Sequence, residues 1–154
     1  MACLFFAAHS LRLRPMLSQR ARYAMKALLY LADHRDRAAV QIGEIAEAQA
    51  IPRKFLELIL LDLKKAGMVE SSRGKAGGYR LSRPSSDISF GEVIRLFDGP
   101  LALVPCASVT AYKRCADCAD EATCAIRKVM TIVRDSTATI LEAMSLDQAR
   151  GLLS

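Results

Sequence analysis

Long hydrophobic runs are missing from this sequence. No stretch approaches the roughly 18 to 20 consecutive apolar residues that a membrane-spanning helix needs, so we expect a soluble protein with no membrane partner. The apolar run from Ala2 to Ala8 precedes Arg12 and Arg14, whereas a secretory signal places its positive charge before a longer apolar core. Export is therefore not expected. We interpret residues 1–15 as a disordered extension ahead of a natural start at Met16.

Histidine is also scarce, because the chain contains only His9 and His34. The sequence has no Gly-x-Ser-x-Gly, no phosphate-binding loop and no His-Cys pair within one motif, and these are patterns on which nucleophilic and nucleotide-dependent catalysis rely. His34 lies at a predicted helix end, where a histidine caps the helix dipole or is solvated. We therefore predict that the protein is not an enzyme.

Cysteine, by contrast, is concentrated in one short segment. Four of the five cysteines lie between residues 106 and 124. Without an export signal we expect the reducing cytoplasm, where clustered cysteines bind metals or act in redox chemistry more often than they form structural disulfides. Their spacing is compatible with a disulfide staple, a zinc site or an iron-sulfur cluster.

Positive charge is concentrated in a different segment. The formal net charge is +6 over 154 residues, and residues 52–83 carry 8 basic and 3 acidic side chains. Residues 106–154 carry 6 of each. Because a localised basic excess is typical of a nucleic-acid-binding surface, the sequence predicts an acidic partner for the first of these segments and not for the cysteine-rich one.

The basic segment lies within a helix-turn-helix pattern followed by a hairpin. Apolar periodicity predicts a helix over residues 18–33 with Ser18 as N-cap, a short helix over 42–49, and a third helix that starts with Pro52 in its first turn and ends at Gly67. A strand at 68–71, a glycine-rich turn and a returning strand at 79–81 complete the pattern. This order is typical of a winged helix-turn-helix, whose second helix lies in the DNA major groove.

The second helix and the wing supply the predicted DNA-binding residues. Arg53, Lys54 and Glu57 lie away from the apolar stripe, and such side chains pair with guanine or cytosine edges; Glu57 has the alternative of pairing with Arg53 or Lys54 on the helix surface. The wing adds Arg73, Lys75, Gly77, Gly78 and Tyr79. Small residues at the wing tip let Arg73 approach a narrow minor groove.

Two further helices are predicted after the wing. "SFGEVIRLFDGP" opens with Ser89 and Glu92 as a capping box and closes at Gly99. A long helix follows from about Glu121 to Met144, with apolar residues at a/d-like spacing. At 1.5 Å per residue, about 24 residues would span roughly 36 Å. A helix that long cannot bury all its apolar side chains on a small domain, so we predict a homodimer.

Three stretches of the sequence carry a family resemblance: "RARYAMKALLYLA", "IGEIAEAQAIPRKFLELILLDLKKAGMVESSRGKAGGYRLSRP" and "SFGEVIRLFDGP". A cysteine-rich loop and a long helix follow them. Together these features resemble the Rrf-two family of bacterial transcription regulators, in particular its IscR-like members that bind an iron-sulfur cluster. The resemblance runs from about Met16 to Met144. It implies a homodimeric regulator, most simply a repressor, whose binding to a double-stranded DNA operator responds to iron, cluster status, nitric oxide or redox stress. Leu58 and Lys75 depart from frequent family residues, so the operator sequence cannot be transferred.

The implied fold is mainly α, a winged helix-turn-helix with a small β-hairpin wing and a long C-terminal dimerisation helix. The implied organisation is an extension (1–15), a DNA-binding domain (16–100), a cysteine-rich cluster-binding loop (101–120), and a dimerisation helix with a C-terminal tail (121–154).

The resemblance also implies a ligand set. Family members with a cluster use three loop cysteines, and Cys106, Cys118 and Cys124 match those positions. The fourth family ligand is replaced by Arg127 or by Arg22, and arginine stays protonated and does not bind metals. Cys115 is the substitute, which gives four thiolates.

Four thiolates suit an iron-sulfur cluster, 2Fe-2S in preference to 4Fe-4S. Zinc is the alternative, although Cys115 and Cys118 form the only Cys-x-x-Cys pair. A metal-free or zinc-stabilised thiol-responsive regulator and a small iron-sulfur electron carrier remain as rival functions; the basic wing argues against the carrier.

Overall fold

The structure, a computed structural model, describes residues 17–74 and 77–152. These residues form helices and one β-hairpin, as predicted, in the order α1 (Gln19–Asp33), α2 (Ile42–Ala48), α3 (Arg53–Lys65), β1 (Val69–Ser72), β2 (Gly78–Leu81), the 3-10 turn η1 (Ser85–Asp87), α4 (Phe90–Asp98), the 3-10 turn η2 (Pro105–Ala107), α5 (Ala125–Ala143) and α6 (Leu146–Gly151). Within the described ranges no helix is long and apolar enough to cross a membrane.

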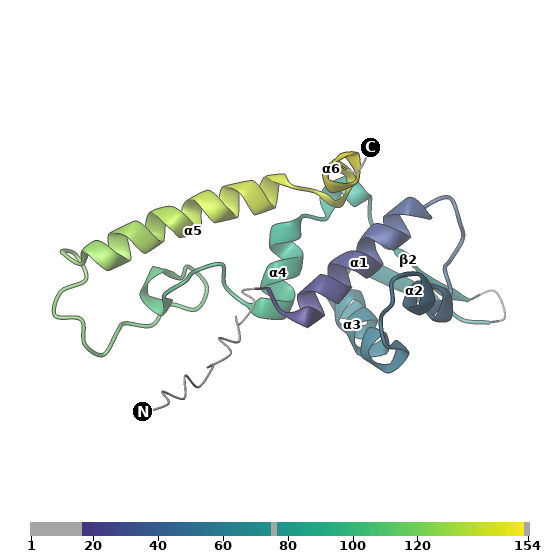
Figure 1. The fold of residues 1–154 in the computed structure, drawn as a ribbon, viewed down its shortest axis with the longest axis horizontal. Helices are drawn as coiled ribbons and strands as arrows, with labels where there is room; N and C mark the ends of the chain where they lie inside the picture. Colours follow the sequence, from purple (N-terminus) through teal and green to yellow (C-terminus); the bar gives the residue numbers. More distant parts are fainter. Residues whose placement is uncertain (1–16, 75–76, 153–154) are drawn as a thin grey trace, which may run out of the picture.

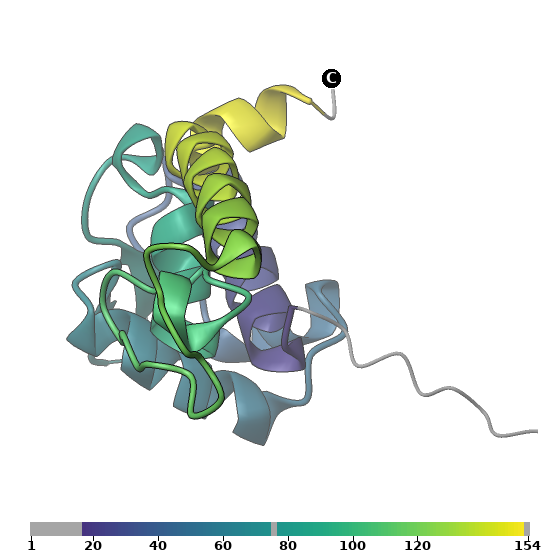
Figure 2. The same ribbon diagram turned by 90° about the vertical axis from the view of Figure 1, so that its left-hand side faces the viewer.

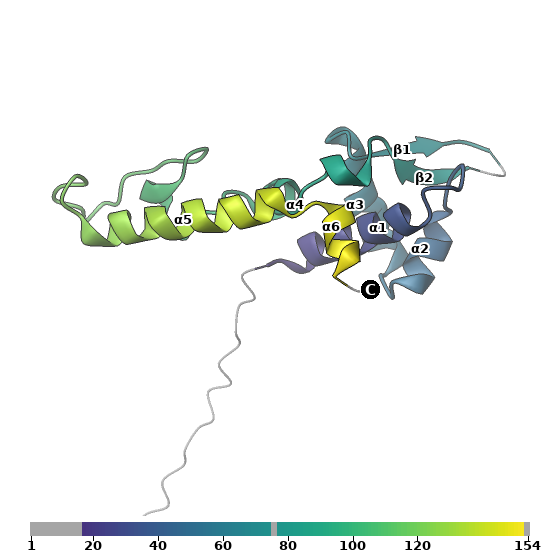
Figure 3. The same ribbon diagram turned by 90° about the horizontal axis from the view of Figure 1, so that it is seen from above.

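The molecule divides into two parts, which we call the head and the arm (Figure 1). The head comprises α1 to α4, the hairpin and α6, that is, residues 17–74, 77–98 and 144–152. The arm comprises the cysteine-rich loop and α5, residues 99–143. Figure 3 shows α5 and the loop extending side by side away from the head, with the hairpin at the opposite end of the molecule.

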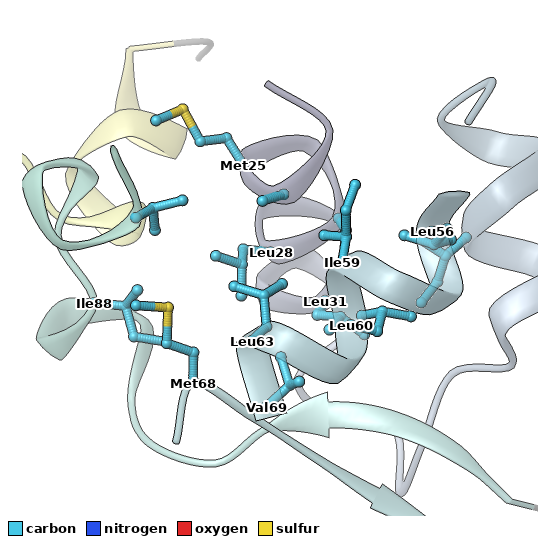
Figure 4. Packing of buried hydrophobic residues seen from close by; sticks show 14 of the residues in the cluster. Met25, Leu28, Leu31, Leu56, Ile59, Leu60, Leu63, Met68, Val69 and Ile88 are labelled. Atoms are coloured by element: carbon cyan, nitrogen blue, oxygen red, sulfur yellow. The ribbon is translucent and has the colours of Figure 1, made fainter. Parts of the chain in front are cut away.

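The hydrophobic core lies in the head. Apolar side chains at helical spacing on α1 and α3 face each other, and Met68 and Ile88 lie together at one side of this core (Figure 4). The fully buried large side chains are Leu28, Leu31, Val40, Ile45, Leu56, Ile59, Leu60, Leu63, Met68, Val69, Ile88 and Leu146. Burying one such side chain stabilises the fold by about 1.5–3 kcal/mol, so this core fixes the relative positions of the helices.

The helix-turn-helix forms where the sequence predicts it, with one local difference. The Ser18 side chain accepts a hydrogen bond from the Ala21 amide at 3.1 Å and caps α1. Pro52 is the N-cap residue of α3 and not part of its first turn, because its extended backbone (ψ 124°) turns its carbonyl toward the following amides. That carbonyl accepts from Phe55 N at 2.9 Å and from Leu56 N at 3.0 Å.

The wing follows directly from the end of α3. Gly67 adopts φ 71°, which favours glycine, and Met68 N donates to the Leu63 carbonyl at 2.9 Å to terminate the helix. The strands are antiparallel, with register from Val69↔Leu81 to Ser72↔Gly78. Each strand lies within one residue of its predicted position.

A short α6 and a partial capping box were not expected. At the start of α4 the Ser89 side chain accepts from Glu92 N at 3.1 Å, but the Glu92 carboxylate pairs with Arg83 and does not return to the cap. The complete capping box belongs to α6, between Ser145 and Gln148. Leu146 is buried in the head, so the predicted C-terminal tail in fact contributes to the core.

The long helix α5 begins later than predicted. It starts at Ala125 and not near Glu121, and its 19 residues span about 28 Å. The Asp120 carboxylate accepts from Ala122 N at 3.0 Å and from the Thr123 hydroxyl at 2.9 Å, and these bonds hold a separate turn before the helix. None of the α5 residues is buried. Figure 2, which looks along the arm, shows α5 above the cysteine-rich loop.

Candidate cysteine pocket and DNA-binding surface

All four predicted ligand cysteines line one pocket in the arm. Cys106 belongs to η2, Cys115 and Cys118 to the loop, and Cys124 is the N-cap residue of α5. The pocket has a volume of about 390 Å³ and also includes Arg127 in its lining. Cys106 is buried, the other three are half-buried, and all four are free thiols. The loop therefore brings together residues up to 18 positions apart in the sequence.

The thiols are arranged as two pairs. Cys106 and Cys115 share a side-chain hydrogen bond, which together with partial burial raises the pKa of Cys115. Partial burial raises the pKa of Cys118, and its charge interaction and hydrogen bond with Cys124 raise it further. Within residues 17–74 and 77–152 no three His, Cys, Asp or Glu side chains converge closely enough to hold one metal ion. The closest sulfur partners are therefore Cys106 with Cys115 and Cys118 with Cys124, and all four cysteines line one pocket.

Arginine side chains hold the backbone around this pocket. Arg127 Nε donates to the Cys106 carbonyl at 3.0 Å, and Arg134 donates to the carbonyl of Ala107. Within the loop, the Arg114 guanidinium donates to the Cys118 carbonyl at 3.1 Å. Since Arg127 and Arg134 both lie on α5, they attach the cysteine-bearing η2 turn to the long helix.

The Arg127 backbone contributes as well. Its amide donates to Cys124 Sγ at 3.5 Å, so the thiol of Cys124 caps α5. Sequence reasoning noted Arg127 as a residue unable to bind metal and missed its contact with Cys106; it missed Arg134 entirely. The available signal was their spacing, because residues seven apart lie on one face of a helix.

The acidic side chains of the loop mostly point to other partners. Glu121 accepts from the Tyr112 hydroxyl at 2.7 Å, and this bond raises the pKa of Tyr112. The backbone amide of Ala122 lowers the pKa of Asp120. Asp117 lines the pocket and contributes to the raised pKa of Cys115. The pocket lining therefore combines four cysteines with two aspartates, Asp117 and Asp120, and one arginine.

The predicted DNA-binding residues of α3 lie on its solvent face. Arg53, Lys54 and Glu57 are exposed. Arg53 Nε lies 3.5 Å from Glu57 Oε1 as an i,i+4 pair, which is the alternative considered for Glu57. An exposed pair of this kind contributes little to stability, so both side chains remain available to a ligand.

The wing and α3 meet at a groove. The starts of α2 and α3 and the inner side of the hairpin line a hollow of about 460 Å³, which includes Arg53, Gly74 and Tyr79. Arg73 is exposed beside it, while Lys75 lies outside the described residues. The helix and the wing therefore face the same side of the head.

Gly77 and Gly78 have structural reasons for their identity, and Tyr79 pairs through its backbone. A Cβ on Gly77 would lie 2.5 Å from the Ser72 carbonyl oxygen, and one on Gly78 would lie 2.4 Å from that of Val40. Tyr79 exchanges two 2.8 Å backbone hydrogen bonds with Val40. These contacts attach the wing to the segment before α2, and a direct contact of the three residues with DNA stays a prediction.

Comparison with known proteins identifies the family. Residues 17–149 match the Rrf2 family, described as an iron-dependent transcriptional regulator. The chain belongs to the Rrf2 family. An rrf2-like HTH-type transcriptional regulator of Rhodobacter capsulatus is 47% identical over 135 residues, which cover 86% of this chain and 90% of that protein. The Rrf2 family consists of transcriptional regulators and not enzymes, as predicted.

Solved structures of similar proteins confirm the winged-helix fold. The structure of T. potens IscR has a TM-score of 0.70 at 28% identity and covers 90% of this chain and 88% of its own. CymR, the global cysteine regulator of B. subtilis, has a TM-score of 0.71 at 25% identity, with 88% and 96% covered. The predicted resemblance to Rrf2 regulators is thus confirmed.

Proposed function

We propose that this Rrf2 protein is a homodimeric repressor whose operator binding is modulated by an iron-sulfur cluster bound by Cys106, Cys115, Cys118 and Cys124. The observation that carries the proposal is the arrangement of four free thiols in two pairs around one pocket. The names of the relatives support it, because IscR and CymR are both described as regulators.

The pairing of the thiols favours a 2Fe-2S cluster. Each iron of such a cluster takes two protein ligands, and four cysteines complete the set. A zinc ion needs its four ligands around one centre, and the two separate pairs fit that requirement less well. When bound, the cluster supplies reversible one-electron chemistry and sensitivity to iron supply. The residues of this chain supply the four thiolates, and Arg127 supplies a positive charge that offsets them.

The outer face of α5 supports a homodimer. Its exposed apolar side chains repeat at helical spacing and lie on the side away from Arg127 and Arg134; they are Ile126, Val129, Ile132, Val133 and Ile140. A continuous apolar face of this kind marks an interaction site. A second copy offers the same face in return, and isologous pairing of two such helices buries both.

The contacts of α5 suggest how the pocket could influence DNA binding. At one end, Arg127 and Arg134 attach the cysteine-bearing turn to α5. At the other end α5 packs closely on α4, where a Cβ on Gly91 would lie 3.3 Å from the Glu142 amide, and Glu142 pairs with Arg95. If ligation of the thiols orders the loop, the position of α5 relative to the head would therefore change. This movement would alter the spacing of the two α3 helices in a dimer.

The α3 and wing residues would read the operator in the cytoplasm. Arg53, Lys54 and Glu57 would contact base edges in the major groove of double-stranded DNA, and Arg73 and Lys75 the adjacent minor groove. Repression is the proposed outcome, since a dimer bound across a promoter blocks polymerase sterically. The DNA-binding unit would comprise residues 16–100, the cluster loop 101–120 and the dimerisation segment 121–154.

The deciding experiment compares cluster-loaded and cluster-free protein. Protein purified without oxygen should be coloured and contain iron and sulfide in equal amounts, with little zinc. Its affinity for duplexes selected from a random-sequence library, at one fixed salt concentration, should differ at least tenfold from that of the iron-free protein. Matched Cys106→Ser and Cys3→Ser variants compare a pocket cysteine with a cysteine outside the cysteine-rich segment.

Different failures point to different functions. Zinc without iron would support the zinc-stabilised alternative, and loss of DNA binding on thiol oxidation of metal-free protein would support a thiol sensor. Reversible reduction of a bound cluster with unchanged DNA affinity would favour the electron carrier and discard the switch.

A further inference from the structure

The solvent face of α3 carries exposed leucines at its centre. Leu58 is 59% exposed and Leu61 is 47% exposed, although Leu56, Ile59, Leu60 and Leu63 already form the buried face of the same helix. Neither exposed leucine is needed for the core. The helix therefore presents apolar surface on the side that faces away from the head.

Basic side chains lie at both ends of this leucine pair, and its acidic neighbours Glu57 and Asp62 are paired with Arg53, Arg20 and Lys65. Lys54, Leu58, Leu61 and Lys65 follow one another at spacings of four, three and four residues, which places them in one stripe along the helix. Lys64 donates to the Ser71 hydroxyl of the wing at 2.7 Å on one flank. This apolar patch lies within a basic surface, beside the groove lined by Arg53 and the wing. A negatively charged duplex matches such a surface better than a second copy of the same basic face does.

We propose that Leu58 reads thymine by packing on its 5-methyl group in the major groove, with Leu61 extending the contact. The thymine methyl is the apolar group that a base pair presents in that groove. Leucine has no hydrogen-bonding group, so a base that offers an unpaired donor or acceptor at this position is disfavoured. Leu58 lies one turn after Lys54, close enough to the helix start to reach base edges.

This inference rests on the proposed function, because it requires α3 to lie in the major groove. It adds that each half-site of the operator contains a thymine opposite Leu58. Under this inference, the side chain at position 58 determines which operators the protein selects.

The test replaces thymine with uracil, a change that removes only the methyl group. Duplexes are selected from a random-sequence library with the full-length protein, and each thymine of the selected site is replaced in turn by deoxyuridine. At one position per half-site we expect affinity to fall about fourfold, the value for one buried methyl. For Leu58→Ala the same replacement should change affinity by less than twofold.

Control variants keep the result interpretable. Leu152→Ala removes a leucine that is 75% exposed just after α6 and should retain the full uracil effect. Thermal unfolding of Leu58→Ala, expected to match that of the parent, verifies that the head is intact. Equal affinity for thymine and uracil at every position, or an unchanged uracil effect in Leu58→Ala, would overturn the inference. Failure to select any duplex would instead overturn the proposed DNA reading itself.

Discussion

The head and the arm bury their apolar side chains in different ways. The head places twelve large side chains in a fully buried core, whereas none of the nineteen residues of α5 is buried. In the head, apolar faces of several short helices meet one another (Figure 4). In the arm, polar contacts from arginines to backbone carbonyls hold the loop, and the apolar face of α5 points outward. The head is thus stabilised by its own core, while the long helix of the arm contributes no buried residue to a comparable core.

The largest difference should come from truncating a core leucine. Leu60→Ala in the head should lower the free energy of unfolding by about 2–5 kcal/mol, because it leaves a cavity in a closed core. Leu103→Ala in the arm, where the side chain is 51% exposed, should cost less than about 0.5 kcal/mol. Urea denaturation followed by circular dichroism measures both. Similar losses for the two variants would mean that the arm shares the core of the head.

A smaller effect per chain is expected on α5, and it should concern association. Ile132→Ala removes an exposed apolar side chain from the outer face, and each copy in a dimer would lose about 1.5–3 kcal/mol of burial. The dimer dissociation constant should rise more than tenfold in sedimentation or mass photometry, with unfolding of the head unchanged. Lys128→Ala, on the same helix but outside the apolar face, is the matched control. A parent protein that stays monomeric at every concentration would contradict the prediction.

The arginine contacts of the arm should contribute less again and act locally. Arg127→Met removes the bond to the Cys106 carbonyl and a charge-assisted contact of this kind is worth about 1.5–3 kcal/mol when fully formed, which is less here because the side chain is half-exposed. Hydrogen exchange of the peptide spanning residues 104–110 should accelerate, by up to about tenfold. Exchange in α1 should stay the same, and acceleration there would show that the effect is not confined to the arm.

The smallest effect concerns the turn between α2 and α3. Ala50 has φ 51°, a left-handed conformation that costs a residue with a side chain about 1–2 kcal/mol. Glycine removes this strain, but the greater conformational entropy of its unfolded chain lowers the free energy of unfolding by about 0.4–1 kcal/mol. Ala50→Gly should therefore raise the free energy of unfolding by about 1 kcal/mol or less, seen as a higher midpoint of thermal unfolding. A lower midpoint would show that the alanine methyl makes a needed contact.

The head was more predictable from the sequence than the arm. Its helix boundaries follow from local signals such as the Ser18 cap and the left-handed Gly67, which act within a few residues. The predicted start of α5 was wrong because a turn held by the Asp120 carboxylate competes with the helix. The periodicity of apolar residues does not report such a turn. The short helix α6 was missed because the burial of Leu146 arises from contacts with distant segments.

The candidate site shows the same division. The spacing of the cysteines and the family resemblance identified the four thiols, and the structure brings them to one pocket. Their arrangement around the pocket could not be predicted, because it depends on the path of the loop, which the cysteine spacing does not encode. The roles of Arg127 and Arg134 likewise depend on carbonyl positions that no residue pattern encodes. Whether the thiols bind a cluster stays a proposal.

The separation of the cysteine pocket from the wing has a practical consequence for a regulator. Because these two regions lie at opposite ends of the molecule (Figure 3), a duplex held by α3 and the wing would leave the pocket open to the surrounding medium. Under the proposed function, small oxidants, nitric oxide or iron donors would then reach the thiols while the protein is bound to DNA. Gene output could be reset in place, without the protein first having to leave the chromosome and search for its target again.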